Sequence, residues 1–135
     1  MSNRDIMVNT KLPLKAYGDL KAFKLFLLDT GLLTCMTGLN QSTLIEGNKL
    51  FVEFKGALTE QYVLQQLVTI ENLNIYYYTN DRGSCEIDFL LDNGVLPVEV
   101  KAEVNLKAKS LKVYKEKYNL EIPARISMND YKKEE

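Results

Sequence analysis

Two acidic residues and one lysine stand where their spacing could support chemistry. The stretch CEIDFLLDNGVLPVEVKAE runs from Cys85 to Glu103 and predicts two short apolar strands joined by a tight turn. Asp88 lies in the first strand, and Glu99 and Lys101 lie in the second. Carboxylates brought together across such a hairpin suit a hard divalent cation, Mg²⁺ or Mn²⁺, and the lysine could polarise a phosphate or orient a water.

The turn decides which of these residues face each other. Asn93-Gly94 is a strong hairpin signal, because a type I′ turn needs positive φ at both central residues. With these two residues as the loop, Asp88 falls directly opposite Glu99. Opposed like charges destabilise a sheet, and two close carboxylates do not both ionise cheaply without a positive charge between them. The facing acids therefore indicate a metal site.

Alternation along the two strands predicts one charged face and one apolar face. The charged face would carry Glu86, Asp88, Leu90, Pro97, Glu99 and Lys101, and the apolar face Ile87, Phe89, Leu91, Val98 and Val100. A simpler interpretation stays open, in which the charged face meets water and Glu86 forms a cross-strand ion pair with Lys101.

The surrounding pattern predicts the elements that would position this hairpin. We expect a strand over about 23–28, a capped turn and short helix to about residue 36, a helix over about 50–72, a strand in NIYYYTN with alternate tyrosine rings buried, a turn at NDRG, a helix over 108–118, and a last strand in IPARISM. The longer helix carries a stripe of Glu60, Val63, Leu64, Leu67 and Glu71, and the later one turns Leu111, Val113 and Tyr114 inward. Helix, three strands, helix and strand define an α/β domain with a mixed sheet over 46–135, after an N-terminal extension over 1–45.

Composition narrows the classes of function. The 135 residues are 46% hydrophobic with a net charge of −1, which argues against a broad phosphate-binding surface. The absence of histidine excludes Ser-His-Asp and Cys-His catalysis and histidine-ligated zinc. Cys35 and Cys85 form no metal-type cluster and predict reduced, buried thiols. With no signal peptide and no apolar run of membrane-spanning length, we expect a cytoplasmic protein without membrane contact.

The spacing Asp88…Glu99-Val100-Lys101, with the apolar neighbours EIDFLL and PVEVK, resembles the PD-(D/E)XK nuclease superfamily. The resemblance implies a restriction-endonuclease-like α-β-β-β-α-β core, with Asp88 and Glu99 as metal ligands and Lys101 assisting hydrolysis. Many members add a glutamate on the first core helix, where FKGALTEQYV offers Glu60. An acid on an otherwise apolar stripe is costly unless it is paired, which favours a site role over a stripe-edge glutamate that reaches water.

Further segments resemble the C-terminal domain of unknown function of prokaryotic predicted AAA+ ATPases. They are KLFLLDTGLL, KGALTEQYVLQQL, YYYTNDRGSCEIDFLL, VEVKAE and KAKSLKVYKEKYNLEIPARISMNDY. In that family a P-loop ATPase precedes this domain. No GxxxxGK[ST] stretch occurs here, so we expect the ATPase domain to be absent from this chain. The resemblance implies a Mg²⁺-dependent DNA nuclease, and the alternative is an inactive nuclease-fold module that contacts the ATPase, a protein partner or a second copy.

Basic residues near the hairpin are candidates for DNA contact. Lys109 and Lys112 on the later helix and Arg82 in the preceding turn could reach phosphates, although a solvated helix face and a plain turn explain them too. Asp29-Thr30-Gly31 matches an aspartic protease motif, but that chemistry needs a second aspartate, and a capped helix start explains the segment better.

Overall fold

The computed structural model describes residues 2–6, 13–39, 42, 49–80, 82–102, 109–119, 123–127 and 129–130. Their elements, in chain order, are β1 (Ser2–Ile6), a 3₁₀ turn (Leu14–Tyr17), β2 (Gly18–Leu25), α1 (Thr30–Met36), α3 (Lys49–Leu67), β3 (Ile75–Thr79), β4 (Glu86–Leu91), β5 (Leu96–Val100), α4 (Lys109–Tyr118) and β6 (Ala124–Ile126). The fold is therefore mixed α/β, as the sequence predicts, and the order from α3 to β6 is helix, three strands, helix and strand.

A single mixed sheet joins the described strands in the order β2-β1-β3-β4-β5-β6. β1 pairs antiparallel with β2 and parallel with β3, while β3, β4 and β5 form an antiparallel meander and β6 lies parallel to β5. The strands near the N-terminus thus extend the same sheet that carries the hairpin. The division of the chain at residue 45 stays a prediction.

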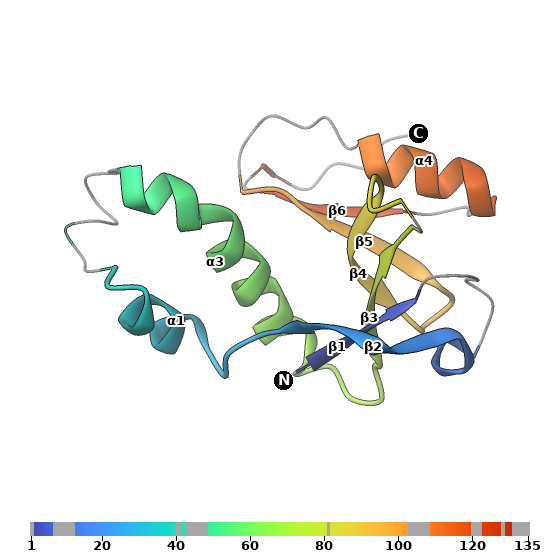
Figure 1. Ribbon diagram of the computed structural model, residues 1–135, viewed down its shortest axis with the longest axis horizontal. Helices are drawn as coiled ribbons and strands as arrows, with labels where there is room; N and C mark the ends of the chain where they lie inside the picture. Colours follow the sequence, from blue (N-terminus) through green and yellow to red (C-terminus); the bar gives the residue numbers. More distant parts are fainter. Residues whose placement is uncertain are drawn as a thin grey trace.

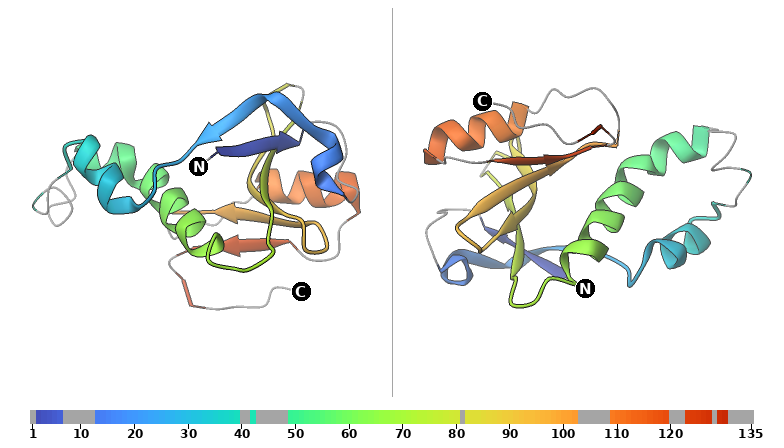
Figure 2. Two further views of the ribbon diagram at one scale, coloured as in Figure 1. Left: turned by 90° about the horizontal axis from the view of Figure 1, so that it is seen from below. Right: turned by 180° about the vertical axis from the view of Figure 1, so that it is seen from behind.

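α3 and α4 cover opposite faces of the sheet, as Figure 1 and the right-hand view of Figure 2 show. The cluster under α3 contains Val63, Leu64, Phe89, Leu91, Val98 and Val100. The cluster under α4 contains Leu14, Tyr76, Tyr78, Cys85, Ile87, Leu90, Val95, Leu111 and Tyr114. α1 packs beside α3 rather than on the sheet. The central strands are therefore buried on both faces.

The hairpin between β4 and β5 has the predicted register. Phe89 pairs with Val98, and Leu91 pairs with Leu96. The turn itself differs from the prediction, because positive φ angles occur at Gly94 (76°) and Val95 (55°) and not at Asn93. Residues 92–95 form a four-residue connection instead of a two-residue type I′ loop. The register is unchanged because the longer turn takes one residue from each strand, so the remaining residues keep their partners.

A β-bulge in β4 changes the two predicted faces. Tyr76 pairs with Leu90 and Tyr78 with Ile87, so two residues of β4, Asp88 and Phe89, oppose one residue of β3. The extra residue reverses the alternation, and Ile87 therefore packs with Leu90 under α4. The predicted placement of Ile87 beside Phe89 is wrong for this reason, whereas Leu90 lies on its predicted face, opposite Phe89 and Leu91. All three consecutive tyrosines of β3 are buried, rather than alternate ones, because both faces of the sheet are covered.

The helices differ from the sequence patterns at their ends and on one face. α3 ends at Leu67, and Glu71 lies exposed in the turn beyond it, so the predicted stripe stops one turn early. In α4, Leu111 is buried but Val113 is 51% exposed, contrary to the prediction. Residues two apart on a helix lie about 200° apart, which explains why they do not share a face. Asp29 accepts the backbone N–H of Leu32 and caps α1, as expected.

Further predictions near the N-terminal segment are corrected or confirmed in the same way. β2 spans Gly18–Leu25 instead of about 23–28, since the chain leaves the sheet after Leu25 to enter α1. Both cysteines are thiols, but only Cys85 is buried, while Cys35 lies on the exposed side of the seven-residue α1.

Candidate functional site

Asp88 lies at the bulge, where β4 and β5 begin to separate. Its Oδ2 atom accepts the backbone N–H of Val100 at 2.7 Å, so the carboxylate takes the place of a ladder hydrogen bond between the two strands. Burial raises the pKa of Asp88, and the negative charge of Glu86 raises it further. The Val100 N–H and the charges of Lys24 and Lys101 oppose this shift and reduce it. The bulge therefore aims Asp88 into the space between the strands rather than onto a simple charged face.

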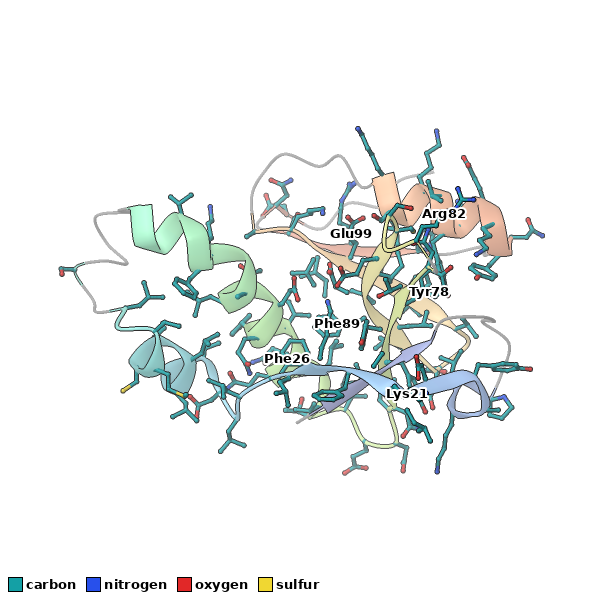
Figure 3. The ribbon with its side chains drawn as sticks, viewed as in Figure 1. Lys21, Phe26, Tyr78, Arg82, Phe89 and Glu99 are labelled. Carbon is teal, nitrogen blue, oxygen red and sulfur yellow. The ribbon has the colours of Figure 1, made fainter. Side chains whose placement is uncertain are left out.

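Glu99 of β5 forms an ion pair with Lys101, the first residue after the strand, with 2.6 Å between the Lys101 Nζ and the Glu99 Oε1 atoms. Glu99 is 4% exposed, and its Oε2 atom meets no hydrogen-bond donor among the described residues. Val98 and Val100 pack under α3, so alternation directs Glu99 toward the other face. Its charge accordingly reaches Cys85 of the cluster under α4. Figure 3 shows Glu99 on β5.

A second charged group lies on the α3 side, around a lysine of β2. The Lys24 ammonium forms ion pairs with Glu86 of β4 and, at 3.7 Å, with Glu60 of α3. It also lies 5.3 Å from the centre of the Tyr77 ring. Lys24 therefore connects β2 to α3 and to β4 through ion pairs.

The pKa values in this second group follow from burial and crowding of like charge. Burial raises the pKa of Glu60, the neighbouring negative charges of Asp88 and Glu86 raise it further, and Lys24 opposes them. Burial alone would lower the pKa of Lys24. The hydrogen bond to Glu86 and the surrounding carboxylates outweigh burial, and the net pKa of Lys24 is raised.

Asp88 links the two groups, because the charges of Lys24 and Lys101 both act on it. The predicted site residues Asp88, Glu99, Lys101 and Glu60 thus belong to one connected set. The alternative interpretation expected an ion pair between Glu86 and Lys101 on a solvated face. The observed ion pairs are different, because Glu86 pairs with Lys24 and Lys101 pairs with Glu99.

The donor set of Asp88 and Glu99 is compatible with a hard divalent cation in part. One oxygen of each carboxylate is held by the chain, and the Oε2 atom of Glu99 is buried without a hydrogen-bond donor among the described residues. Mg²⁺ is commonly held by one or two carboxylates, with waters and substrate phosphate completing its shell. Within the described residues no group of three or more acidic, histidine or cysteine side chains is arranged around a metal position. The chain therefore offers two ligands, not a complete cage.

The predicted DNA-contacting residues lie outside this set. Arg82 is exposed in the turn between β3 and β4 (Figure 3), where Asn80 organises the loop by accepting the backbone N–H groups of Ser84 and Cys85. Lys109 and Lys112 are exposed on α4, and Lys112 lies 4.0 Å from Glu116 one turn on.

That turn and α4 are neighbours in space. The Cys85 thiol donates to the backbone carbonyl of Ser110 at 3.5 Å. Arg82 and the α4 lysines therefore belong to one side of the molecule, next to the cluster under α4.

Sequence reasoning missed Lys24 and Gln61. Lys24 had a readable signal, a single cation inside the otherwise apolar run AFKLFLL. Gln61 is 3% exposed and uses both ends of its amide on one residue, accepting the Leu27 N–H and donating to the Leu27 carbonyl, each at 2.9 Å. A glutamine inside a helix is common, so a single sequence does not indicate that Gln61 is buried or bonded to another segment.

The family model for "Domain of unknown function (DUF4143)" matches residues 55–135, which is more than half of the chain. The chain belongs to this family. The matched region contains Glu60, Asp88, Glu99 and Lys101, whereas Lys24 precedes it. No curated protein and no solved structure matches the chain significantly. Among the described helices none is both long and apolar enough to cross a membrane.

Proposed function

We propose that this chain is a nuclease-like domain of the PD-(D/E)XK kind that hydrolyses phosphodiester bonds of DNA with Mg²⁺ or Mn²⁺. The support is the order helix, three strands, helix and strand, with the acid of β4, the Glu-x-Lys of β5 and the helix glutamate in the places that the sequence resemblance implies. By the same resemblance it would work beside a P-loop ATPase domain, as a single copy or a homo-oligomer.

One observation carries the proposal more than any other. Glu99 has one oxygen held by Lys101 and a second, Oε2, that is buried without a donor among the described residues; Asp88 has one oxygen held by the Val100 N–H, and Lys101 acts on both residues. Buried polar atoms are rarely left without partners, and such an atom in a charged site indicates a missing ligand. A cation between two carboxylates would satisfy this need.

The residues of the chain divide the work of hydrolysis. When bound, Mg²⁺ supplies charge neutralisation to a phosphodiester oxygen. Asp88 and Glu99 would hold it, and the Val100 N–H fixes the orientation of the Asp88 carboxylate. Lys101, oriented by Glu99, would place a positive charge beside the scissile phosphate or hold the attacking water. Glu60 would be an accessory acidic residue whose carboxylate acts as a base and accepts a proton, because burial and nearby acids raise its pKa.

DNA would approach along the side that carries Arg82, Lys109 and Lys112. These exposed cations would contact backbone phosphates and set the register of the duplex without reading its sequence. With a net charge of −1 for the chain, the contact would be local and weakened by salt.

The test begins with calorimetric titration of the full chain with Mn²⁺ and Mg²⁺, beside Asp88→Asn, Glu99→Gln and the control Glu71→Gln. Glu71 is exposed beyond α3, so its variant removes the same charge without touching the site. We expect saturable binding in the wild type and the control, and its loss in the two site variants.

Cleavage of supercoiled plasmid is then measured with the wild type and Lys101→Ala. Loss of cleavage in the variant, with metal binding retained, would support the assigned roles. Cleavage that persists unchanged in both Asp88→Asn and Lys101→Ala would refute them.

A second candidate is a non-catalytic interaction module that binds the ATPase part or another protein. It is favoured by exposed apolar side chains on β2 and after it, including Leu20, Leu25 and Leu28. Patches of this kind mark interaction surfaces. Absence of metal binding, together with a stable oligomer in light scattering that Lys101→Ala leaves intact, would select this candidate.

A further inference from the structure

Lys24 differs from the other residues of the site in where it comes from. It lies on β2, before the family-matched residues 55–135, and reaches across to α3 and β4. Its ammonium is bounded by Glu60 and Glu86 through ion pairs and by the charge of Asp88. A lysine that is largely buried keeps its charge only where carboxylates compensate for the lost hydration.

The same ammonium lies beside the strand that carries the proposed metal ligand Asp88, because it pairs with Glu86, two residues earlier on β4. The charges of Lys24 and Lys101 both act on Asp88. A positive charge close to a cation site lowers cation affinity by direct repulsion and by neutralising the carboxylates that attract the cation. Burial strengthens both effects, since solvent screens charges in the interior poorly.

We propose that Lys24 is a further residue of this site, an internal counter-ion with which a divalent cation at Asp88 and Glu99 must compete. This inference rests on the proposed metal site. It assigns to β2 a positioning and regulatory role: with Lys24 in place the acids are neutralised and metal binds weakly, and with Lys24 withdrawn metal binds tightly.

The segment that directly follows β2 is attached to α3 partly through polar contacts, which fits such a role. Gln61 holds the backbone of Leu27, and Gln65 accepts the Thr30 N–H at 3.3 Å. The aromatic contact between Phe26 and Phe89, with ring centroids 5.9 Å apart, supplies the apolar part (Figure 3). Movement of β2 would therefore change the charge beside Asp88, and it would also loosen the contact of Phe26 with the cluster under α3.

The experiment measures Mn²⁺ affinity by calorimetry in the full chain and in Lys24→Met, Lys24→Arg and Lys21→Met. Methionine keeps the length of the side chain and removes its charge, while arginine restores the charge. Lys21 lies on the same strand, is exposed, and stands well apart from Glu99 in Figure 3. Its variant therefore controls for the loss of one positive charge from the chain.

We expect Lys24→Met to bind Mn²⁺ about tenfold more tightly than the wild type, with Lys24→Arg and Lys21→Met close to the wild type. Equal or weaker binding in Lys24→Met, while the wild type binds, would overturn the role of Lys24 and leave the metal site standing. No binding in any of the proteins would overturn the metal site and this inference together.

A second readout uses the unaltered chain, in case Lys24→Met folds poorly. Lysine side-chain NMR during a Mg²⁺ titration should shift the Lys24 ammonium and adjacent methylene signals in step with metal occupancy, with the Lys21 signals unchanged. Saturation of the metal site with no change at Lys24 would also overturn the inference.

Discussion

Replacement of Gln61 by alanine tests how the segment that carries Lys24 is held. The Gln61 amide forms two hydrogen bonds with the backbone of Leu27, one as donor and one as acceptor, each at 2.9 Å. A hydrogen bond in a folded protein contributes about 0.5–1.5 kcal/mol net, and unpaired buried groups cost more. Since Leu27 is half-buried, water would partly replace the lost amide. We therefore expect Gln61→Ala to lower the free energy of unfolding by about 2 kcal/mol.

Urea unfolding followed by circular dichroism measures this loss, with Gln65→Ala as the matched control. Gln65 lies one turn along the same helix and makes a single, longer bond of 3.3 Å to the Thr30 N–H. Its variant should lose about 0.5 kcal/mol. The amide of Leu27 should also exchange its hydrogen faster in Gln61→Ala. A loss below about 0.5 kcal/mol in Gln61→Ala, or equal losses in the two variants, would refute the reasoning.

Three further predictions follow from the packing and the ionisation of named groups. Leu111→Ala should cost about 2–4 kcal/mol in urea unfolding because it opens a cavity under α4, whereas Val113→Ala should cost less than about 0.5 kcal/mol, and similar costs would contradict the assignment of the α4 face. Burial raises the pKa of the Cys85 thiol, so a thiol-specific dye at pH 8 should label Cys35 rapidly and Cys85 only after unfolding; equal labelling rates would contradict its burial. Burial and nearby acids raise the pKa of Glu60 above its unfolded value, so the stabilising contribution of its protonated form is complete below the unfolded pKa and is lost as pH rises through the folded pKa. The Glu60→Gln variant should therefore be more stable than the wild type at pH 7 and equally stable near pH 4. The opposite order of stability at pH 7 would show that the ion pair with Lys24 dominates.

The fold could be predicted from the sequence wherever the signal was local. The register of the β4–β5 hairpin follows from its turn-forming residues and its two apolar runs, and it was correct although the turn geometry was not. The short helix after Asp29 followed from its cap in the same way. Such features depend on neighbours in the chain, which a single sequence displays.

The features that could not be predicted depend on contacts between distant segments. The bulge at Asp88 and Phe89 arises from the pairing of β4 with β3, and no residue type within β4 predicts it. It moved Ile87 to the opposite face, and an alternation rule applied to one strand does not register that change. The ion pair between Lys24 and Glu60 joins residues 36 positions apart, so their spacing in the sequence does not predict the contact.

Val95 in the hairpin turn ties the length of that turn to the chemistry of the strands. It adopts a positive φ of 55°, which is unfavourable for a β-branched residue, and its side chain is buried in the cluster under α4. Burial offsets the backbone cost, so the turn is anchored in the core. Because the side-chain period of a strand is two, inserting one residue there would turn Glu99 toward Val63 and Leu64 and direct the flanking valines the other way. We therefore expect relatives with an active site to keep the length of this turn and an apolar residue at the position of Val95, while the exposed Asn93 can change.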